Sequence, residues 1–179
     1  MGDPNDHSLN TPEGAKVTKE LKRELLSPDA RGLTLSHVMG FSEEEVKSTY
    51  AKACQRLAQN DLAGAGKLFA MLVALRHNEG KHWRGLGVVA QRSNQPGPCD
   101  FLYSMALKHD PNDIISMVFR AEARVNTGRA AAGRQDLLNA IELGERLGNP
   151  EHGTYVKRAK KVLQLIDAGE TNAGSFEKS

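Results

Sequence analysis

The feature that most constrains this chain is an internal repeat, because the middle of the sequence aligns with itself when shifted by 34 residues. Side chains of similar size coincide in three successive copies. Small residues recur at two positions, a large apolar residue at a third and a turn-forming residue at a fourth: Ala53, Gly87 and Ala121; Ala65, Cys99 and Gly133; Phe69, Tyr103 and Leu137; and Asn60, Asn94 and Gly128. A fixed period of this length is typical of stacked supersecondary units. We therefore expect a repeat array.

The middle copy identifies the kind of repeat. It fits the tetratricopeptide pattern W-x2-L-G…Y-x2-A…P at Trp83, Leu86, Gly87, Tyr103, Ala106 and Pro111. In this register Trp83 is expected to be buried near Tyr103. No sustained alternation of apolar and polar residues indicates a strand. The sequence predicts an all-α tetratricopeptide superhelix of three helix-turn-helix repeats, with N-terminal helices and a C-terminal capping helix.

Composition and turn signals divide the chain into four parts. The two ends are polar and rich in residues that do not support a packed core. We expect a disordered N-terminus over 1–15, an N-terminal helical region over 16–40, a repeat domain over 41–168 and a disordered tail over 169–179. Within the domain, the repeats cover about 46–79, 80–113 and 114–147, followed by a capping helix over 150–168.

Helix starts are predicted from capping residues. Ser42 and Glu45 have the spacing of a capping box, and Phe41 and Val46 are placed to form a hydrophobic staple beside it. Asp110-Pro111 and Asn149-Pro150 predict two more starts, each with proline at the first helical position.

Composition excludes several classes of protein. The 24 basic and 22 acidic side chains give a formal charge of +2, without the basic stripe expected for nucleic acid. The basic run over 157–161 is interpreted as the solvated face of a helix. Cys54 and Cys99 form no metal or disulfide pattern and are expected to be packed as small apolar residues. The chain has no apolar run of the roughly 18–20 residues that span a membrane and no apolar signal core, so we expect a cytoplasmic protein without stable membrane insertion.

Short motifs across about 32–147 resemble a narrower family, the class II chaperones of bacterial type III secretion. The matching segments are Gly32-Leu-Thr-Leu, Gly40-Phe-Ser-Glu, Tyr50-Ala-Lys-Ala, Asn60-Asp-Leu-Ala-Gly-Ala, Leu75-Arg-His-Asn, Trp83-Arg-Gly-Leu-Gly and Gly128-Arg-Ala-Ala-Ala-Gly. The resemblance implies a cytoplasmic, non-enzymatic chaperone of a Gram-negative bacterium that keeps hydrophobic translocator proteins soluble and secretion-competent. It also implies a homodimer formed through the N-terminal helices, for which we expect contacts from Leu33, Leu35, Val38 and Met39.

The predicted binding site is the concave groove, which the first helix of each repeat lines. The resemblance implies that an extended N-terminal segment of the translocator lies there. We expect Tyr50, Leu57, Val88 and Phe119 to be its main apolar contacts. The full predicted set is Lys47, Tyr50, Ala51, Cys54, Leu57, His77, Arg84, Val88, Gln91, Phe119 and Glu122. Cys54 and Leu57 stand where the family often has aromatic residues, so the pockets are expected to differ.

The sequence also bears on three other functions. A tetratricopeptide co-chaperone that binds an acidic C-terminus needs Lys, Asn and Arg at certain groove positions. This function is not supported, because the residues at those positions cannot pair with a carboxylate: Tyr50, Cys54, Gly85, Ile115 and Phe119. A nucleotide-binding enzyme is not supported, because Gly64-Ala-Gly-Lys67 lacks the first glycine and the Ser/Thr of a phosphate loop. The histidines show no metal spacing, so neither a cofactor nor a metal is expected. A general tetratricopeptide scaffold in secretion or pilus assembly shares the same fold and stays open as the alternative.

Overall fold

The computed structural model describes residues 34–169, and this part of the chain is helical throughout, without strands. Its elements are α2 (Leu35–Val38), α3 (Glu43–Ala58), α4 (Leu62–Leu75), α5 (Gly80–Arg92), α6 (Pro96–His109), α7 (Ile114–Asn126), α8 (Ala130–Leu147), the 3-10 helix η3 (Pro150–His152) and α9 (Gly153–Asp167). The predicted all-α class is confirmed. The expected segment 1–15, most of 16–40 with Leu33, and nearly all of the tail lie outside the described residues.

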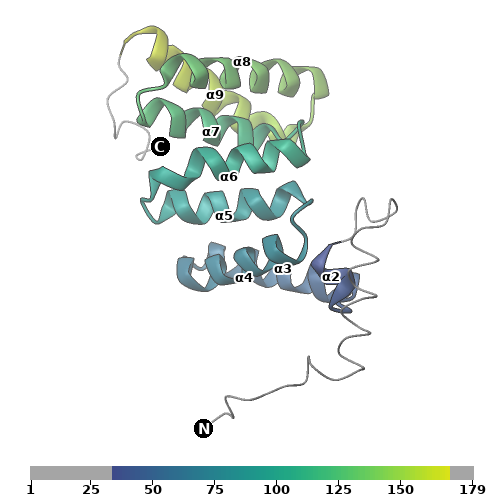
Figure 1. Ribbon diagram of the computed structural model, residues 1–179. Coiled ribbons are helices and arrows are strands. Elements are labelled where there is room, and N and C mark those ends of the chain that lie inside the picture. Colours follow the sequence, from purple (N-terminus) through teal and green to yellow (C-terminus); the bar gives the residue numbers. More distant parts are fainter. Residues whose placement is uncertain (1–33, 170–179) are drawn as a thin grey trace, which may run out of the picture.

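The helices form hairpins that stack in one direction (Figure 1). Helices α3 and α4, α5 and α6, and α7 and α8 pack as pairs, and each pair packs on the next through α4 with α5 and α6 with α7. Helix α9 closes the stack by packing on both α7 and α8. The first helices of the pairs, α3, α5 and α7, therefore follow one another along one side of the superhelix.

The turn inside each hairpin is made by the residue that the 34-residue alignment selects. Asn60, Asn94 and Gly128 have φ angles of 62°, 53° and 77°, in the left-handed region. Asparagine and glycine tolerate this region better than other residues, because other side chains crowd the backbone there. A single backbone requirement thus explains why these residue types recur.

The predicted start of α3 is confirmed, whereas the predicted start of α7 is shifted. At α3 the capping box is present as predicted, with the Ser42 hydroxyl accepting a hydrogen bond from the Glu45 backbone N–H. Helix α7, however, begins at Ile114 and not at Pro111. Asp113 is its cap, accepting from the Ser116 backbone N–H at 3.3 Å, while Asp110 and Pro111 remain in the preceding turn. The helix therefore starts after Asp113, which caps it, and not after Asp110.

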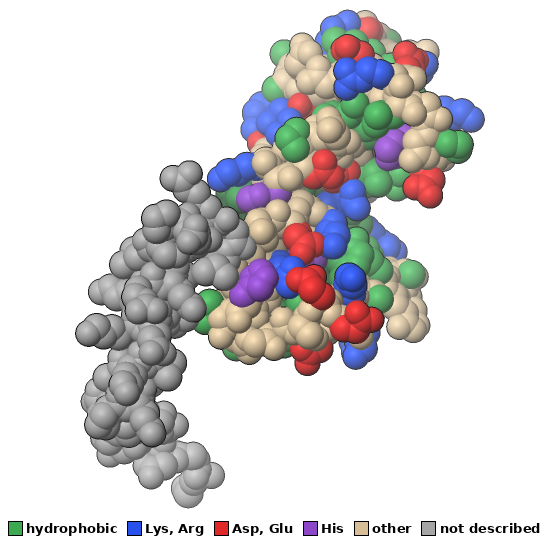
Figure 2. Space-filling model, turned by 90° about the vertical axis from the view of Figure 1, so that its right-hand side faces the viewer, with side chains coloured by type: hydrophobic (Ala, Val, Ile, Leu, Met, Phe, Trp, Pro, Cys, Tyr) green, Lys and Arg blue, Asp and Glu red, His purple; other side chains and the backbone are tan. Residues whose placement is uncertain are grey.

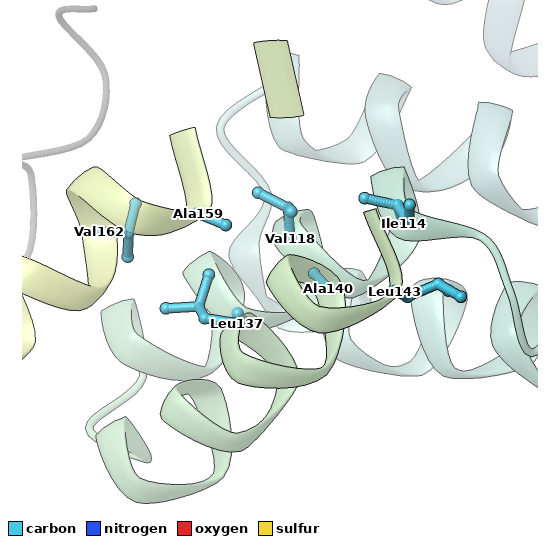
Figure 3. Close-up of a cluster of buried hydrophobic side chains, with 8 residues drawn as sticks. Ile114, Val118, Leu137, Ala140, Leu143, Ala159 and Val162 are labelled. Atoms are coloured by element: carbon cyan, nitrogen blue, oxygen red, sulfur yellow. The ribbon is translucent and has the colours of Figure 1, made fainter. Parts of the chain in front are cut away.

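The core consists of three clusters along the stack, each centred on one hairpin. The aligned large residues Phe69, Tyr103 and Leu137 are all buried. A Cβ atom at Gly87 would lie 2.7 Å from the Tyr103 ring, so the small residue there is required by the close approach of α5 and α6. Figure 3 shows the C-terminal cluster, where Ile114 and Val118 of α7 meet side chains from α8 and α9.

Trp83 is less buried than the sequence predicts. Its ring is only partly covered and lies edge-on to Phe101, with 6.1 Å between the ring centroids. Its Nε1–H donates to the carbonyl of His77 at 2.7 Å, which ties α5 to the linker before it. The indole therefore contributes a hydrogen bond at the hairpin edge, while Tyr103 supplies the buried ring.

Ion pairs join the two helices of the third hairpin and connect that hairpin to the second. Arg120 stands where the repeat usually has leucine, and its guanidinium donates two hydrogen bonds to Asp136 of α8, at 2.9 and 2.8 Å. Arg124 donates to the same carboxylate at 2.8 Å and to Asp100 of α6 at 2.7 Å. Asp136 is buried, so the third repeat replaces the apolar contact of the usual leucine by a charged network.

A candidate peptide-binding pocket between α5, α7 and α9

A pocket of about 580 Å³ lies between the C-terminal parts of α5 and α7, bounded by the turn into α6 and by one side chain of α9. Its lining residues are Val88, Gln91, Arg92, Asn94, Pro96, Cys99, Phe119, Glu122, Ala123, Asn126 and Arg158. Most of the wall comes from α5 and α7, the first helices of the second and third hairpins, as expected for the concave side of such a superhelix. The volume is in the range of small-ligand pockets, so it has room for one or two side chains of a partner.

The pocket brings together four of the predicted groove residues, namely Val88 and Gln91 of α5 and Phe119 and Glu122 of α7. Within each helix the two residues are three positions apart, so they share a face. The structure does not bring the remaining predicted residues to this pocket, and their part in binding stays a prediction.

A buried carboxylate forms the floor of the pocket. The side chain of Glu122 is only 1% exposed and accepts hydrogen bonds from Arg158 Nε at 2.5 Å and from Arg158 Nη2 at 3.0 Å. The hydrogen bonds that Arg158 donates to Glu122 raise the pKa of Arg158. Gln91 donates to Glu122 at 3.4 Å and accepts from the Tyr103 hydroxyl at 2.8 Å. Every buried polar group in this chain of contacts thus has a partner, which such a site requires.

Phe119 is held on several sides. Its ring centroid lies 5.8 Å from that of Tyr103 and 6.0 Å from that of Tyr155, the second pair being edge-to-face. The guanidinium carbon of Arg158 lies 5.5 Å from the centroid of the same ring, a cation–π distance. Replacing Phe119 would therefore remove packing between α6, α7 and α9, so Phe119 is less suitable than Val88 for isolating a binding effect.

Arg158 is the pocket residue on α9, a helix on which the sequence analysis predicts no groove residue. Its neighbours Lys157 and Lys160 are exposed, as expected for the solvated face of a helix, but Arg158 turns inward to Glu122. Arg158 lies beside the apolar side chains by which α9 packs on the core, namely Tyr155, Ala159, Val162 and Ile166. A glutamate at a groove-facing position, such as Glu122, needs a cationic partner when it is buried. This requirement is the sequence signal that could have predicted a role for Arg158.

The predicted groove residues of the first repeat lie on α3, outside the pocket. Tyr50, Cys54 and Leu57 are partly buried and pack against the first core cluster, while Lys47 and Ala51 are exposed. Burial raises the pKa of Tyr50, whose ring lies 6.0 Å from that of Phe69 between centroids. These residues lie at the N-terminal end of the stack, apart from the pocket.

Arg84 and His77 lie nearer the other end of α5. Arg84 Nη1 pairs with the buried carboxylate of Asp113 at 2.8 Å, so its guanidinium links α5 to the cap of α7. His77 is exposed in the linker before α5, with its ring 6.4 Å from that of His109 between centroids. The pocket lies at the C-terminal end of α5, so the structure separates His77 from it.

Three sequence features that could suggest a catalytic or metal site have a structural role or do not come together in the described residues. No group of His, Cys, Asp or Glu within residues 34–169 could hold a metal ion. The segment that loosely resembles a phosphate loop lies inside α4, where Asp61 caps the helix by accepting from the Gly64 backbone N–H at 2.8 Å. Burial raises the pKa of Cys99, which favours the thiol over the nucleophilic thiolate.

Comparison with known proteins relates this fold to one group of solved structures. No family model and no curated protein matches the sequence. A type III secretion complex from Aeromonas hydrophila matches at 20% identity and a TM-score of 0.75, over 85% of this chain and 97% of the other. The chain shares the fold of the translocator chaperone SycD from Yersinia enterocolitica. That match has 24% identity and a TM-score of 0.67, over 75% of this chain and 99% of SycD.

A further structure with this fold contains a bound partner. PcrH from Pseudomonas aeruginosa, in complex with the chaperone-binding region of PopD, matches at 23% identity and a TM-score of 0.67, over 73% of this chain and 97% of the other. The predicted tetratricopeptide superhelix is thus confirmed as the fold.

Proposed function

We propose that this protein is a cytoplasmic chaperone of bacterial type III secretion that holds an extended segment of a hydrophobic translocator in its concave groove. The observation that carries the proposal is the fold, which it shares with translocator chaperones over 97–99% of their chains. The motifs over 32–147 that resemble the class II chaperones support it independently. The role is one of binding and protection, without catalysis.

The pocket has the chemistry that such a role needs. An extended peptide presents side chains to apolar recesses and leaves backbone N–H and C=O groups that need partners. Val88 and Phe119 supply the apolar wall, and Gln91 and Asn126 supply amides beside it. No helix within residues 34–169 is long and apolar enough to cross a membrane.

The test is co-expression with the translocators of the native host. Candidate cargo is identified by purifying the tagged protein from that host, and each candidate is then produced with and without the chaperone. The proposal expects the translocator to remain in the supernatant only when the chaperone is present. A translocator that stays equally soluble alone, or that never co-purifies, would contradict it.

A matched pair of variants ties this effect to the groove. Val88→Glu places a charge in the apolar wall of the pocket, whereas Met71→Glu makes the same kind of change on α4, where Met71 is exposed. We expect the first variant to lose the translocator and the second to retain it, with similar melting temperatures for both. The general scaffold alternative predicts instead that secretion or pilus components other than translocators co-purify.

A further inference from the structure

Two guanidinium groups lie on the pocket, and the protein uses only part of their hydrogen-bonding capacity. Arg158 donates hydrogen bonds from Nε and Nη2 to Glu122. Arg92 donates from Nη1 to the Leu57 carbonyl and from Nη2 to the Asn60 side chain, each at 2.9 Å. Within residues 34–169 this leaves Nη1 of Arg158 and Nε of Arg92 without a protein acceptor. Both residues line the cavity, so a ligand there meets N–H donors.

The pocket also carries an excess of positive charge. Glu122 is its one acidic lining residue among those described, and it is neutralised by Arg158 and hidden beneath it, with side-chain exposures of 1% and 31%. A ligand therefore meets the guanidinium and not the carboxylate. Arg92 adds a second positive charge, which forms no ion pair within residues 34–169.

Arg158 is held in place before any ligand arrives. Its two bonds to Glu122 fix the guanidinium plane, and the ring of Phe119 supports it at 5.5 Å. A group that is already ordered loses little conformational entropy on binding. A partly buried guanidinium also binds an anion more strongly than a fully solvated one, because the surroundings screen the charge less.

The rest of the lining is apolar or carries amides. Val88, Pro96, Cys99, Phe119 and Ala123 form the apolar part. Asn94 and Asn126 are exposed at the rim, where their side-chain amides can meet the backbone of a bound segment.

We propose that this pocket recognises a carboxylate next to an aliphatic side chain, so that the cargo segment is selected for an acidic group as well as for its hydrophobicity. The inference rests on the proposed function, since it assumes that an extended segment lies in the groove. The aliphatic side chain occupies the apolar wall, and the carboxylate accepts from Arg158 with Arg92 nearby. The carboxylate belongs to an Asp or Glu side chain or to a chain end.

The experiment uses random twelve-residue peptides displayed on beads, in two arms. In one arm the peptides are attached through their C-termini, which removes the terminal carboxylate, and in the other they are attached through their N-termini. Both arms are selected on the full-length wild type, on Glu122→Gln/Arg158→Gln, and on Arg134→Gln, which alters an exposed arginine of α8. The double variant removes both charges together, so no buried carboxylate is left without its partner.

We expect wild type and Arg134→Gln to enrich peptides with an acidic residue beside an aliphatic one, and the double variant to enrich aliphatic residues alone. Changing the acidic residue of the best peptide to its amide should weaken binding to the wild type about tenfold and leave binding to the double variant unchanged. Enrichment only in the arm with free C-termini would assign the carboxylate to a chain end.

The opposing outcomes separate the two proposals. Aliphatic peptides enriched without any acidic preference, or with the same acidic preference on the double variant, would overturn this inference and leave the groove function intact. A wild type that enriches no peptide at all would count against the groove function itself.

Discussion

At the scale of single residues, two buried rings of the core each lie against a glycine of α5. Gly87 faces Tyr103 within the second hairpin, and Gly85 faces Phe69 of α4 where the first and second hairpins meet. Because the helices approach so closely at these glycines, the rings of Phe69 and Tyr103 are fully buried. The glycines are thus selected by volume and not by backbone freedom.

Gly87→Ala tests this packing. The added methyl group would lie 2.7 Å from a ring that has no room to move, so we expect a loss of roughly 1–3 kcal/mol in the free energy of unfolding. Gly97→Ala is the control, because a Cβ atom there meets nothing within 4 Å and the residue lies in the first turn of α6. It should leave stability unchanged or raise it by up to about 1 kcal/mol. Urea denaturation of both variants measures the difference, and equal midpoints would contradict the account.

His82 gives the stability a pH dependence. The side chain is fully buried, its Nε2 has no hydrogen-bond partner in the described chain, and burial lowers its pKa from the ordinary 6.5, against the attraction of Glu79. A lowered pKa in the folded state means that the full stability is present above pH 6.5 and is lost as the pH falls through the folded-state pKa.

We therefore expect the free energy of unfolding to decrease as the pH is lowered from 7.5 to 5.5. The decrease should be smaller in His82→Phe, because phenylalanine fills the site with an aromatic ring that cannot be protonated. The decline that remains in the variant should include a contribution from His109, whose pKa is also lowered by burial. Chemical denaturation at several pH values gives both slopes. Parallel slopes would show that His82 does not titrate with folding.

At this scale the sequence predicts some features well and others poorly. The left-handed turns at Asn60 and Asn94 and the buried ring of Tyr103 follow from local constraints of backbone and volume, which a repeat period displays directly. The inward turn of Arg158 depends on the angle at which α9 docks on α7, a tertiary property that no local pattern encodes. The same reason explains why the pocket could be predicted on α5 and α7 but not on α9.

At the scale of elements, α6, α7 and α8 are joined by charged side chains as well as by apolar ones. The buried Asp136 of α8 accepts hydrogen bonds from two arginines of α7, and one of these arginines continues to Asp100 of α6. The network passes through three consecutive helices, so it fixes their relative positions. The start of α7 at Ile114 instead of Pro111 likewise follows from a side-chain cap, at Asp113, that competes with a proline signal.

Asp136→Ala should cost about 3–5 kcal/mol of stability, because it leaves Arg120 and Arg124 half-buried without their shared partner. The control is Asp167→Ala, which removes the partner of Arg134 from an ion pair that is exposed on both sides and should cost about 0–1 kcal/mol. Thermal unfolding of the two variants decides the matter. Similar losses for both would mean that the buried network contributes no more than a surface pair.

At the scale of the whole molecule, charges of both signs alternate with apolar side chains over the face in Figure 2. Helix α2 is attached to this body by a buried arginine, because Arg76 donates to Ser36 at 2.5 Å and pairs with Glu43 at the start of α3. This attachment leaves Leu35 and Met39 at 44% and 59% exposure. Large apolar side chains exposed side by side are typical of an interaction surface.

We expect the protein to self-associate through α2, with Leu35, Val38 and Met39 in the contact. Leu35→Glu/Met39→Glu should shift the protein toward the monomer in sedimentation velocity, because charges would be buried in the interface. Leu147→Glu serves as the control, since Leu147 is also exposed but lies at the end of α8. A wild type that stays monomeric at the highest concentration, or a control that dissociates equally, would refute the assignment.

The stacking of hairpins also determines how the molecule opens. Because the helices pack mainly on their neighbours in sequence, the local free energy of opening depends on the number of interfaces that a segment shares, as in a one-dimensional lattice. Fraying then begins at the ends and spreads inward. Helices α5, α6 and α7 lie at the centre of the stack with interfaces on both sides, so they are the last to open and the apolar wall of the pocket persists longest. Arg158 comes from the terminal helix α9 and is released earlier, which would make the charge of the pocket more labile than its shape.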